Sequence, residues 1–406
     1  MWLMILALAL VLSVAGVVYL YRRFGRFGYV EFLAGDRRWL RRLLAAAPLL
    51  ALGIYAAFRL VNAVIVLLHL AAFWLILDFI SFLGKCVLGR NRKASNAETE
   101  GTAEAEDAAE AAADAAADSP ESDASKSGTR KPYHVYATGV IAILAVAVYL
   151  GFGWFNAHHV SRTAYEVKTE KTVADGDLRI VLFADSHIGT TFSGAELADY
   201  VRRINEEKPD IVVIVGDFVD DGTTKEDLVA ACRSLSGLKA TYGVYYVYGN
   251  HDKGYYNNRA YTPEELAAEI RGAGVTILED EVARIADSVS IIGRKDRGER
   301  SGRKDIAELV KGIAATDFTI VLNHQPNDYD SESAAGVDLV LSGHTHGGQL
   351  LPLGPIGRLF GANDRTYGTE ARKGTTFIVT SGISDWEIDF KTGTFSEYVV
   401  IDVVGK

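Results

Sequence analysis

The chain has 406 residues, of which 49% are apolar, and its formal net charge is −10. This length exceeds that of a usual single domain, so we expect more than one structural unit. The acidic balance and the lack of a basic stripe exclude the electrostatic signature of a nucleic-acid-binding protein, so no nucleic-acid partner is expected.

An apolar run opens the chain at residues 1–21 and is long enough to span a bilayer. Arg22, Arg23 and Arg26 follow this run, whereas the charges of a secretory signal peptide precede its apolar region. The run therefore predicts an uncleaved anchor whose N-terminus lies outside. The arginine-rich loop 22–42 is then expected in the cytoplasm, because cytoplasmic loops carry an excess of basic residues.

Two further apolar regions precede residue 156. Residues 43–84 are too many for one span and are interrupted near Arg59 and Asn62, which predicts two helices joined by a tight turn. Residues 135–155 form a fourth span with aromatic residues at its far end. We thus expect about three transmembrane helices in 1–90 and a fourth in 132–156. Buried core helices are the alternative, but the length of the runs and their scarcity of charge argue against it.

The segment 91–131 separates the third and fourth predicted spans. Ten carboxylates lie between Glu98 and Asp123, as many as the whole net charge, and they predict a disordered acidic spacer. Basic residues flank this spacer, so its ends should be cytoplasmic and everything after residue 156 extracytoplasmic. The protein is therefore expected to be a multi-pass protein of the cell membrane. Cys86 and Cys232 fall on opposite sides and should not pair.

The remainder, 163–406, alternates between strand and helix patterns and predicts an α/β domain. Strands are expected at 177–185, 210–217, 242–252, 274–280, 282–286, 288–293, 318–324, 337–344, 375–382 and 396–403, and helices at 194–210, 225–238 and 262–274. Thr262 and Pro263 are a typical N-cap and first helical residue.

Acids and histidines gather where these strands end. The motifs are FADSHIG with Asp185 and His187, VGDFVD with Asp217 and Asp220, YGNHD with Asn250, His251 and Asp252, LNHQP with His324, and SGHTHGGQ with His344 and His346. Singly, each is typical of a turn or a helix cap. Together they suit a site for two divalent ions, which needs a bridging carboxylate and terminal oxygen and imidazole donors.

In this order, D-x-H, G-D-x-x-D, G-N-H-D, a single H after a strand and G-H-T-H resemble the calcineurin-like metallophosphoesterase superfamily over residues 178–382. GHTHGGQ and the membrane anchor are similar to its YkuE-like bacterial branch. The resemblance implies a four-layer α-β-β-α sandwich. It also implies seven metal ligands, namely Asp185, His187 and His346 for one ion, Asn250, His324 and His344 for the other, and Asp217 bridging them.

The same resemblance assigns roles around the ions. His344 and His346 would alternate on an extended segment, one for each ion. His251 would protonate the leaving oxygen or stabilise the phosphoryl group, and Asp220 would hydrogen-bond His251 and fix its orientation. Asp385, Trp386 and Glu387 are candidates to line the pocket, although a purely structural role suits Trp386 as well.

The function implied is a membrane-anchored phosphoesterase. It would hydrolyse a phosphodiester, pyrophosphate or phosphomonoester by direct attack of a hydroxide that bridges two divalent ions, which the ligand set suits as manganese, iron or zinc. A lipid-linked phosphate is one candidate substrate. The alternative is a non-catalytic membrane sensor or scaffold that uses the domain to bind a ligand. A transporter or channel fits less well, because the spans hold few ionisable residues.

Overall fold

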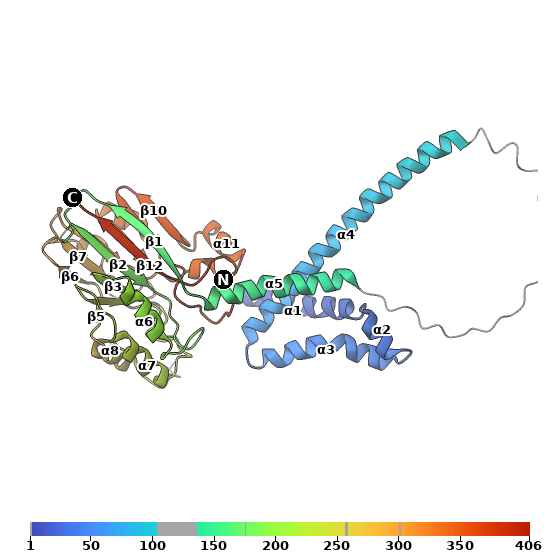
Figure 1. Ribbon diagram of the computed structural model, residues 1–406, viewed down its shortest axis with the longest axis horizontal. Coiled ribbons are helices and arrows are strands. Elements are labelled where there is room, and N and C mark those ends of the chain that lie inside the picture. The colour runs from blue at the N-terminus through green and yellow to red at the C-terminus, as the bar shows by residue number, and fades with distance from the viewer. Residues whose placement is uncertain (1, 104–135, 175, 256–258, 300–301) are drawn as a thin grey trace, which may run out of the picture. The chain divides into compact units, whose positions relative to one another are not determined.

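The computed structural model describes residues 2–103, 136–174, 176–255, 259–299 and 302–406 (Figure 1). The chain divides into two compact units, residues 1–148 and 149–406. The boundary lies within helix α5 (Ala137–His158), whose last turns belong to the second unit.

The first unit is helical. Its elements are α1 (Trp2–Phe24), α2 (Gly28–Ala34), α3 (Arg38–Ala56), α4 (Leu60–Ala103) and the first part of α5. Among the described residues, four helices are long and apolar enough to cross a membrane, over Ala7–Phe24, Arg38–Ala56, Leu60–Cys86 and Ala137–His158. The chain turns between α3 and α4, near the predicted interruption at Arg59. The direction in which each helix would cross a membrane stays a prediction.

Helix α4 differs from the expectation for the acidic spacer. The helix continues to Ala103, beyond residue 91, where a disordered segment was expected to begin. Alanine and glutamate in this stretch have high helix propensity, which favours continuation of a helix already nucleated by the apolar turns before it. The rest of the predicted spacer lies outside the described residues.

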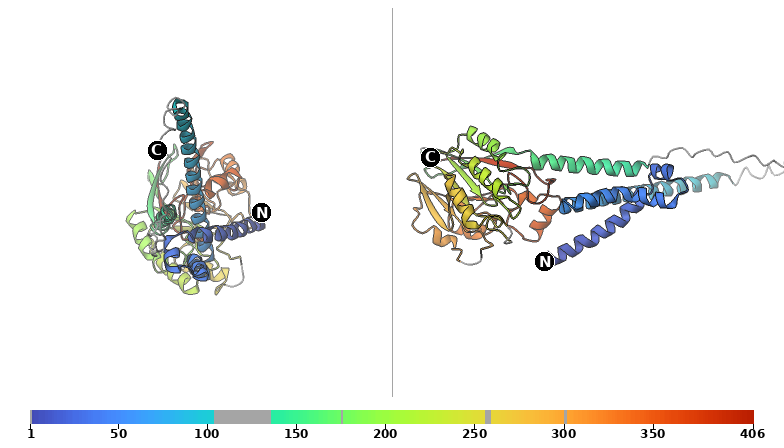
Figure 2. Two further views of the ribbon diagram at one scale, coloured as in Figure 1. Left: turned by 90° about the vertical axis from the view of Figure 1, so that its right-hand side faces the viewer. Right: turned by 90° about the horizontal axis from the view of Figure 1, so that it is seen from below.

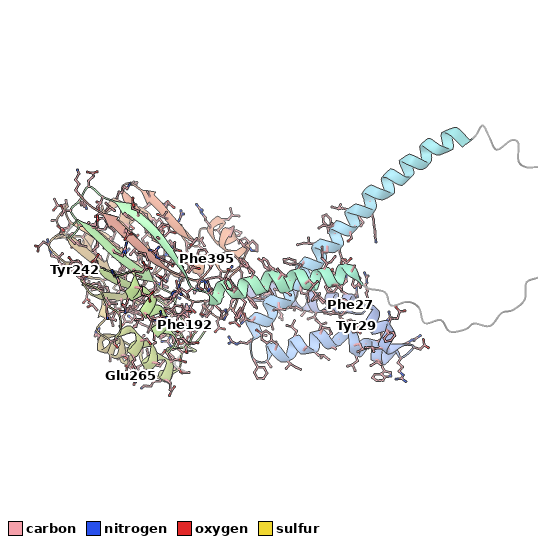
Figure 3. The ribbon with its side chains drawn as sticks, in the orientation of Figure 1. Phe27, Tyr29, Phe192, Tyr242, Glu265 and Phe395 are labelled. Carbon is pink, nitrogen blue, oxygen red and sulfur yellow. The ribbon has the colours of Figure 1, made fainter. Side chains whose placement is uncertain are left out.

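Aromatic contacts hold the described helices of the first unit together. The Phe27 ring, labelled in Figure 3, meets Trp74 and Tyr136 edge to face, with ring centroids 6.0 and 5.4 Å apart. Edge-to-face geometry places the positive edge of one ring against the negative face of the other.

Two six-stranded sheets form the second unit. The first runs in the order β1 (Ser161–Lys168), β12 (Glu397–Val404), β2 (Asp177–Phe183), β3 (Ile211–Val215), β4 (Val244–Val247) and β5 (Thr276–Ile277). The second runs β10 (Gly368–Arg372), β11 (Thr375–Val379), β9 (Leu339–Ser342), β8 (Phe318–Leu322), β7 (Val289–Gly293) and β6 (Glu281–Ile285). Strand β12 lies between β1 and β2, parallel to the former and antiparallel to the latter.

Alternate faces of the strands bury their side chains in different layers. Ile180, Val213, Ile291 and Ile320 share a core between the two sheets. Opposite faces of β2 and β3 pack against helices α6 (Leu197–Glu206), α7 (Lys225–Leu235) and α8 (Pro263–Gly272). The outer face of the second sheet packs against the short helices α9 (Ile306–Leu309) and α10 (Tyr329–Ala334). The predicted four-layer α-β-β-α sandwich is confirmed, and Figures 1 and 2 show the second unit from different sides.

Helix α8 begins as the sequence predicts. The Thr262 hydroxyl oxygen accepts a hydrogen bond from the Glu265 backbone N–H, and the carboxylate of Glu265, labelled in Figure 3, accepts one from the Thr262 backbone N–H. Strands β1 and β10 were not expected. Their exposed faces carry charged residues, so neither has the continuous apolar run by which the inner strands are recognised.

Candidate metal centre

The carboxyl ends of parallel strands from both sheets carry the acids and histidines. Asp185 follows β2, Asp217 follows β3, and His344 follows β9. Because β2 and β3 are parallel neighbours in one sheet and β8 and β9 in the other, their exits lie along the same edge of the sandwich.

Two groups of ligand atoms form at this edge. Asp185, His187 and His346 offer atoms that all lie within 4.8 Å of one another, and so do Asp217, His324 and His344. Asp217 faces both groups, because its Oδ2 lies 3.1 Å from Nε2 of His324 and 3.7 Å from Nε2 of His187. One carboxylate oxygen thus stands between two clusters of donors, as a bridging ligand must.

The backbone at these positions is unusual. Five of the residues that carry these acids and histidines have a positive φ although none is glycine, namely Asp185 (54°), His187 (35°), Asp217 (51°), His344 (71°) and His346 (48°). Such conformations cost of order 1–3 kcal/mol each and cluster at functional sites. The expectation of an extended segment at His344 and His346 is therefore wrong. The chain turns tightly here, and the His344 N–H donates to both carboxylate oxygens of Asp185, at 2.9 and 3.0 Å.

Local contacts orient His324. Its Nδ1 lies 2.8 Å from the carbonyl oxygen of Val215, which fixes the proton on Nδ1 and turns Nε2 toward Asp217. Burial alone would lower the pKa of His324, but attraction to Asp217 raises it well above its ordinary value. Burial alone would raise the pKa of Asp217, but attraction to His324 holds it well below its ordinary value.

The histidines of the GHTH motif behave differently. Burial, reinforced by repulsion from His324, lowers the pKa of His344 to about 3. Burial and repulsion from His187 also hold the pKa of His346 well below its ordinary value. Both imidazoles are consequently neutral at pH 7, the form in which histidine binds a metal.

The donor set leaves polar atoms that need a partner. Nε2 of His324, Nε2 of His187 and Oδ1 of Asn250 are buried without a hydrogen bond. A buried polar atom without a partner costs roughly 1–3 kcal/mol. Divalent ions would satisfy these atoms, and the mixture of carboxylate, imidazole and amide oxygen suits manganese, iron or zinc. The residues therefore fit a pair of metal ions.

Comparison of the sequence with known proteins assigns the chain to a family. Residues 178–348 match the family model described as calcineurin-like phosphoesterase. An uncharacterized metallophosphoesterase of Aquifex aeolicus is 31% identical over 268 residues, which cover 64% of this chain and 98% of that protein. The chain belongs to the calcineurin-like phosphoesterases. The uncharacterized metallophosphoesterase YkuE of Bacillus subtilis is 30% identical over 57% of this chain and 82% of its own length.

Some relatives of this calcineurin-like phosphoesterase are longer. A Danio rerio protein named transmembrane protein with metallophosphoesterase domain is 32% identical over 53% of this chain and 51% of its own length. For other curated relatives, the matching region spans 61% of their length.

The YGNHD motif of the phosphoesterase places two residues beside Asp217. The His251 N–H donates to Oδ1 of Asp217 at 2.9 Å, and its ring lies 5.0 Å from that of His187, centroid to centroid. Asn250 uses Nδ2 to donate to the Tyr255 hydroxyl at 2.6 Å, which leaves Oδ1 as the atom available to a metal.

Asp220 has a different partner from the one expected. Its Oδ2 lies 3.6 Å from Nδ1 of His187, so the carboxylate orients a proposed metal ligand instead of His251. The turn after β3 explains this, because the Gly222 N–H donates to Oδ1 of Asp220 at 2.7 Å and fixes the direction of the carboxyl group.

Two buried acids support the site in ways that the sequence did not predict. Asp252 accepts hydrogen bonds from the backbone N–H groups of Asp217, Phe218, Val219 and Gly249. Asp385 lies with Oδ1 3.8 Å from Nδ1 of His346 and 3.1 Å from Nζ of Lys391, and both side chains of this ion pair are fully buried. Asp252 is the last residue of the GNHD motif, so the sequence does contain a signal for it. No residue pattern near Lys391 indicates a buried cation.

Proposed function

We propose that this protein is a membrane-anchored phosphoesterase that hydrolyses a phosphodiester, pyrophosphate or phosphomonoester with two divalent metal ions. The observation that carries the proposal is the position of Asp217 between two clusters of buried donors. Membership of the calcineurin-like phosphoesterases supports the reaction class.

Seven residues would hold the ions. We assign Asp185, His187 and His346 to one ion, Asn250, His324 and His344 to the other, and Asp217 to both. Ions bound there would lower the pKa of water enough to supply hydroxide at neutral pH and would stabilise charge on the phosphoryl oxygens. The protein keeps the donors in place, because hydrogen bonds from His344 and to Val215 restrict Asp185 and His324 respectively.

His251 would contact the phosphoryl group directly. Burial lowers the pKa of its imidazole, so the ring is neutral at pH 7 and offers one N–H as a hydrogen-bond donor. Such a donor stabilises charge that develops on an oxygen in the transition state. We therefore assign His251 to phosphoryl stabilisation and Asp220 to orientation of His187.

The anchoring helices and the arginine-rich loop 22–42 support an extracytoplasmic catalytic domain in a multi-pass protein of the cell membrane. A reporter fused after residue 165 tests this topology. Reporter activity restricted to the extracytoplasmic side is expected, and activity on the cytoplasmic side would contradict the assigned direction of α5.

The phosphoesterase proposal is tested by Asp217→Asn in the full chain. Turnover of chromogenic phosphodiesters and monoesters should fall to background, and the metal content should drop below two ions per chain, because the amide cannot bridge as a carboxylate does. The matched control is Asp210→Asn at the opposite end of β3, where the carboxylate accepts the Arg179 N–H. Full activity in Asp217→Asn would refute the mechanism. A parent protein that binds two ions but hydrolyses no phosphoester would favour the sensor or scaffold alternative.

A further inference from the structure

Exposed apolar side chains in the second unit concentrate in two short segments. Among the described residues 149–406, seven of the ten large apolar side chains that are exposed belong to the end of α5 or to the chain around α11 (Leu353–Leu359). They are Phe152, Trp154, Phe155, Leu351, Ile356, Leu359 and Phe360. Leu359 and Phe360 are each 80% exposed, an arrangement that signals an interaction surface.

Helix α11 is fixed directly to the proposed metal-binding loop. Gly348, two residues after His346, approaches Gly354 so closely that a Cβ on Gly348 would lie 2.5 Å from the Gly354 Cα. A hollow of about 730 Å³ lies beside this contact, and Gly347, Leu359 and Arg358 are among its lining residues. Leu359 of α11 thus borders a space that is also lined by Gly347, the residue that follows His346 in the chain.

The same loop is tied to the last turns of α5. The Leu351 N–H donates to the Thr392 hydroxyl at 3.1 Å, so the entry to α11 is bonded to the segment 391–393. On its other side this segment is bonded to α5, because Lys391 N–H donates to the Gly153 carbonyl at 2.8 Å and Asn156 Nδ2 donates to the Lys391 carbonyl at 3.1 Å. One hydrogen-bonded segment therefore separates α11 from a helix that could cross a membrane.

We propose that residues 351–360 form a membrane-docking surface that lies in the headgroup region of the bilayer crossed by α5. This inference rests on the proposed membrane anchoring. Aromatic residues at the end of a span, here Trp154 and Phe155, are typical of the membrane–water interface. Because α11 is held one segment away from these residues, Leu359 and Phe360 reach the same interface. Exposed Arg358 complements an anionic lipid surface, and this mixture of apolar and basic side chains is typical of interfacial helices.

Docking specifies a class of substrate for the proposed phosphoesterase. The hollow lined by Gly347 would open at the level of the lipid headgroups, and Gly347 directly follows His346 in the chain. A phosphoester carried on a lipid could enter it without leaving the bilayer. The substrate class that follows is an amphiphilic phosphoester.

Docking is tested with the full chain in vesicles of neutral and anionic phospholipids. An environment-sensitive fluorophore is attached at Phe360→Cys, with Val282→Cys as the matched control, both with Cys86→Ser. Val282 is also exposed, but it lies on β6. This strand is at the edge of the second sheet opposite to β10. A nitroxide on the lipid acyl chains should quench the probe at position 360 and spare the one at 282. Equal quenching at the two positions would overturn the proposal, and so would a probe at 360 that is shielded by protein but not quenched by lipid.

Two controls separate docking from catalysis. Adding Asp217→Asn should leave the quenching at position 360 unchanged, since docking does not require turnover. In Phe360→Glu, turnover of a vesicle-borne diester relative to a water-soluble diester should fall about tenfold or more, as expected for the lost burial of one large apolar side chain. Val282→Glu should keep the parent ratio. An unchanged ratio in Phe360→Glu would overturn the substrate class, whereas a parent protein inactive on diesters, pyrophosphates and monoesters alike, in vesicles and in water, would contradict the proposed function alone.

Discussion

Replacement of Asp252 by asparagine tests how the loop of Asp217 is held. Oδ2 of Asp252 accepts the N–H groups of Asp217 and Gly249 at 2.9 and 2.6 Å, and Oδ1 accepts those of Phe218 and Val219 at 2.8 and 3.2 Å. Asparagine keeps one acceptor oxygen and places an NH₂ group against the other two donors. Two hydrogen bonds to a charged group are then lost, at about 1.5–3 kcal/mol each, or about 3–6 kcal/mol together.

In a domain of this size, each kcal/mol lowers the melting temperature by about 2–4 °C, so Asp252→Asn should lower it by on the order of 10 °C. Thermal unfolding of the full chain in detergent measures this change, and metal analysis of the same sample should show fewer than two ions. Asp210→Asn, whose carboxylate accepts the single Arg179 N–H, should have a smaller effect. If Asp252→Asn unfolded at the parent temperature with its metals retained, Asp252 would not organise the Asp217 loop.

Three further substitutions test other contacts. In Gly348→Ala, the φ of +83° and a Cβ 2.5 Å from the α11 backbone should destabilise the domain more than Gly336→Ala, where φ is +72° and nothing lies within 4 Å; parallel melting curves measure the difference. Lys391→Met leaves Asp385 as a buried charge without its cation, which should cost about 3–5 kcal/mol in unfolding free energy; adding Asp385→Asn should recover part of the loss, and no recovery would contradict the pairing. Burial raises the pKa of the Cys232 thiol to about 12, so maleimide should modify it only after unfolding, and rapid labelling of the folded protein would show that it is accessible.

Sequence patterns predicted the inner strands and their exits because both signals are local. A run of β-branched residues marks β3, and the acid that ends it marks the site edge. The partner of Asp220 could not be predicted in the same way. A turn of only a few residues determines whether its carboxylate faces His187 or His251, and spacing along the chain does not define that direction.

The supporting residues were hidden for a related reason. From the sequence, Lys391 is expected to be an ordinary surface lysine. Its ammonium is buried because the Ser381 and Ser384 carbonyls and the Asp385 carboxylate surround it. These acceptors come from the loop between β11 and β12, whose path the sequence pattern does not define. The apolar residues Leu351, Ile356, Leu359 and Phe360 are exposed in the structure, and no local pattern in the sequence signals their exposure.

The position of β12 between β1 and β2 affects how the protein is made. Ser161 in β1 pairs with Glu397 in β12, so the first strand of the domain waits for one that is translated much later. At 5–20 residues per second the interval is on the order of 10–50 s. Until then, β1 and the adjoining edge of β2 lack their shared neighbour, and unpaired edges invite aggregation. A nascent chain stalled before residue 397 would therefore leave β1 and the adjoining edge of β2 exposed to other chains.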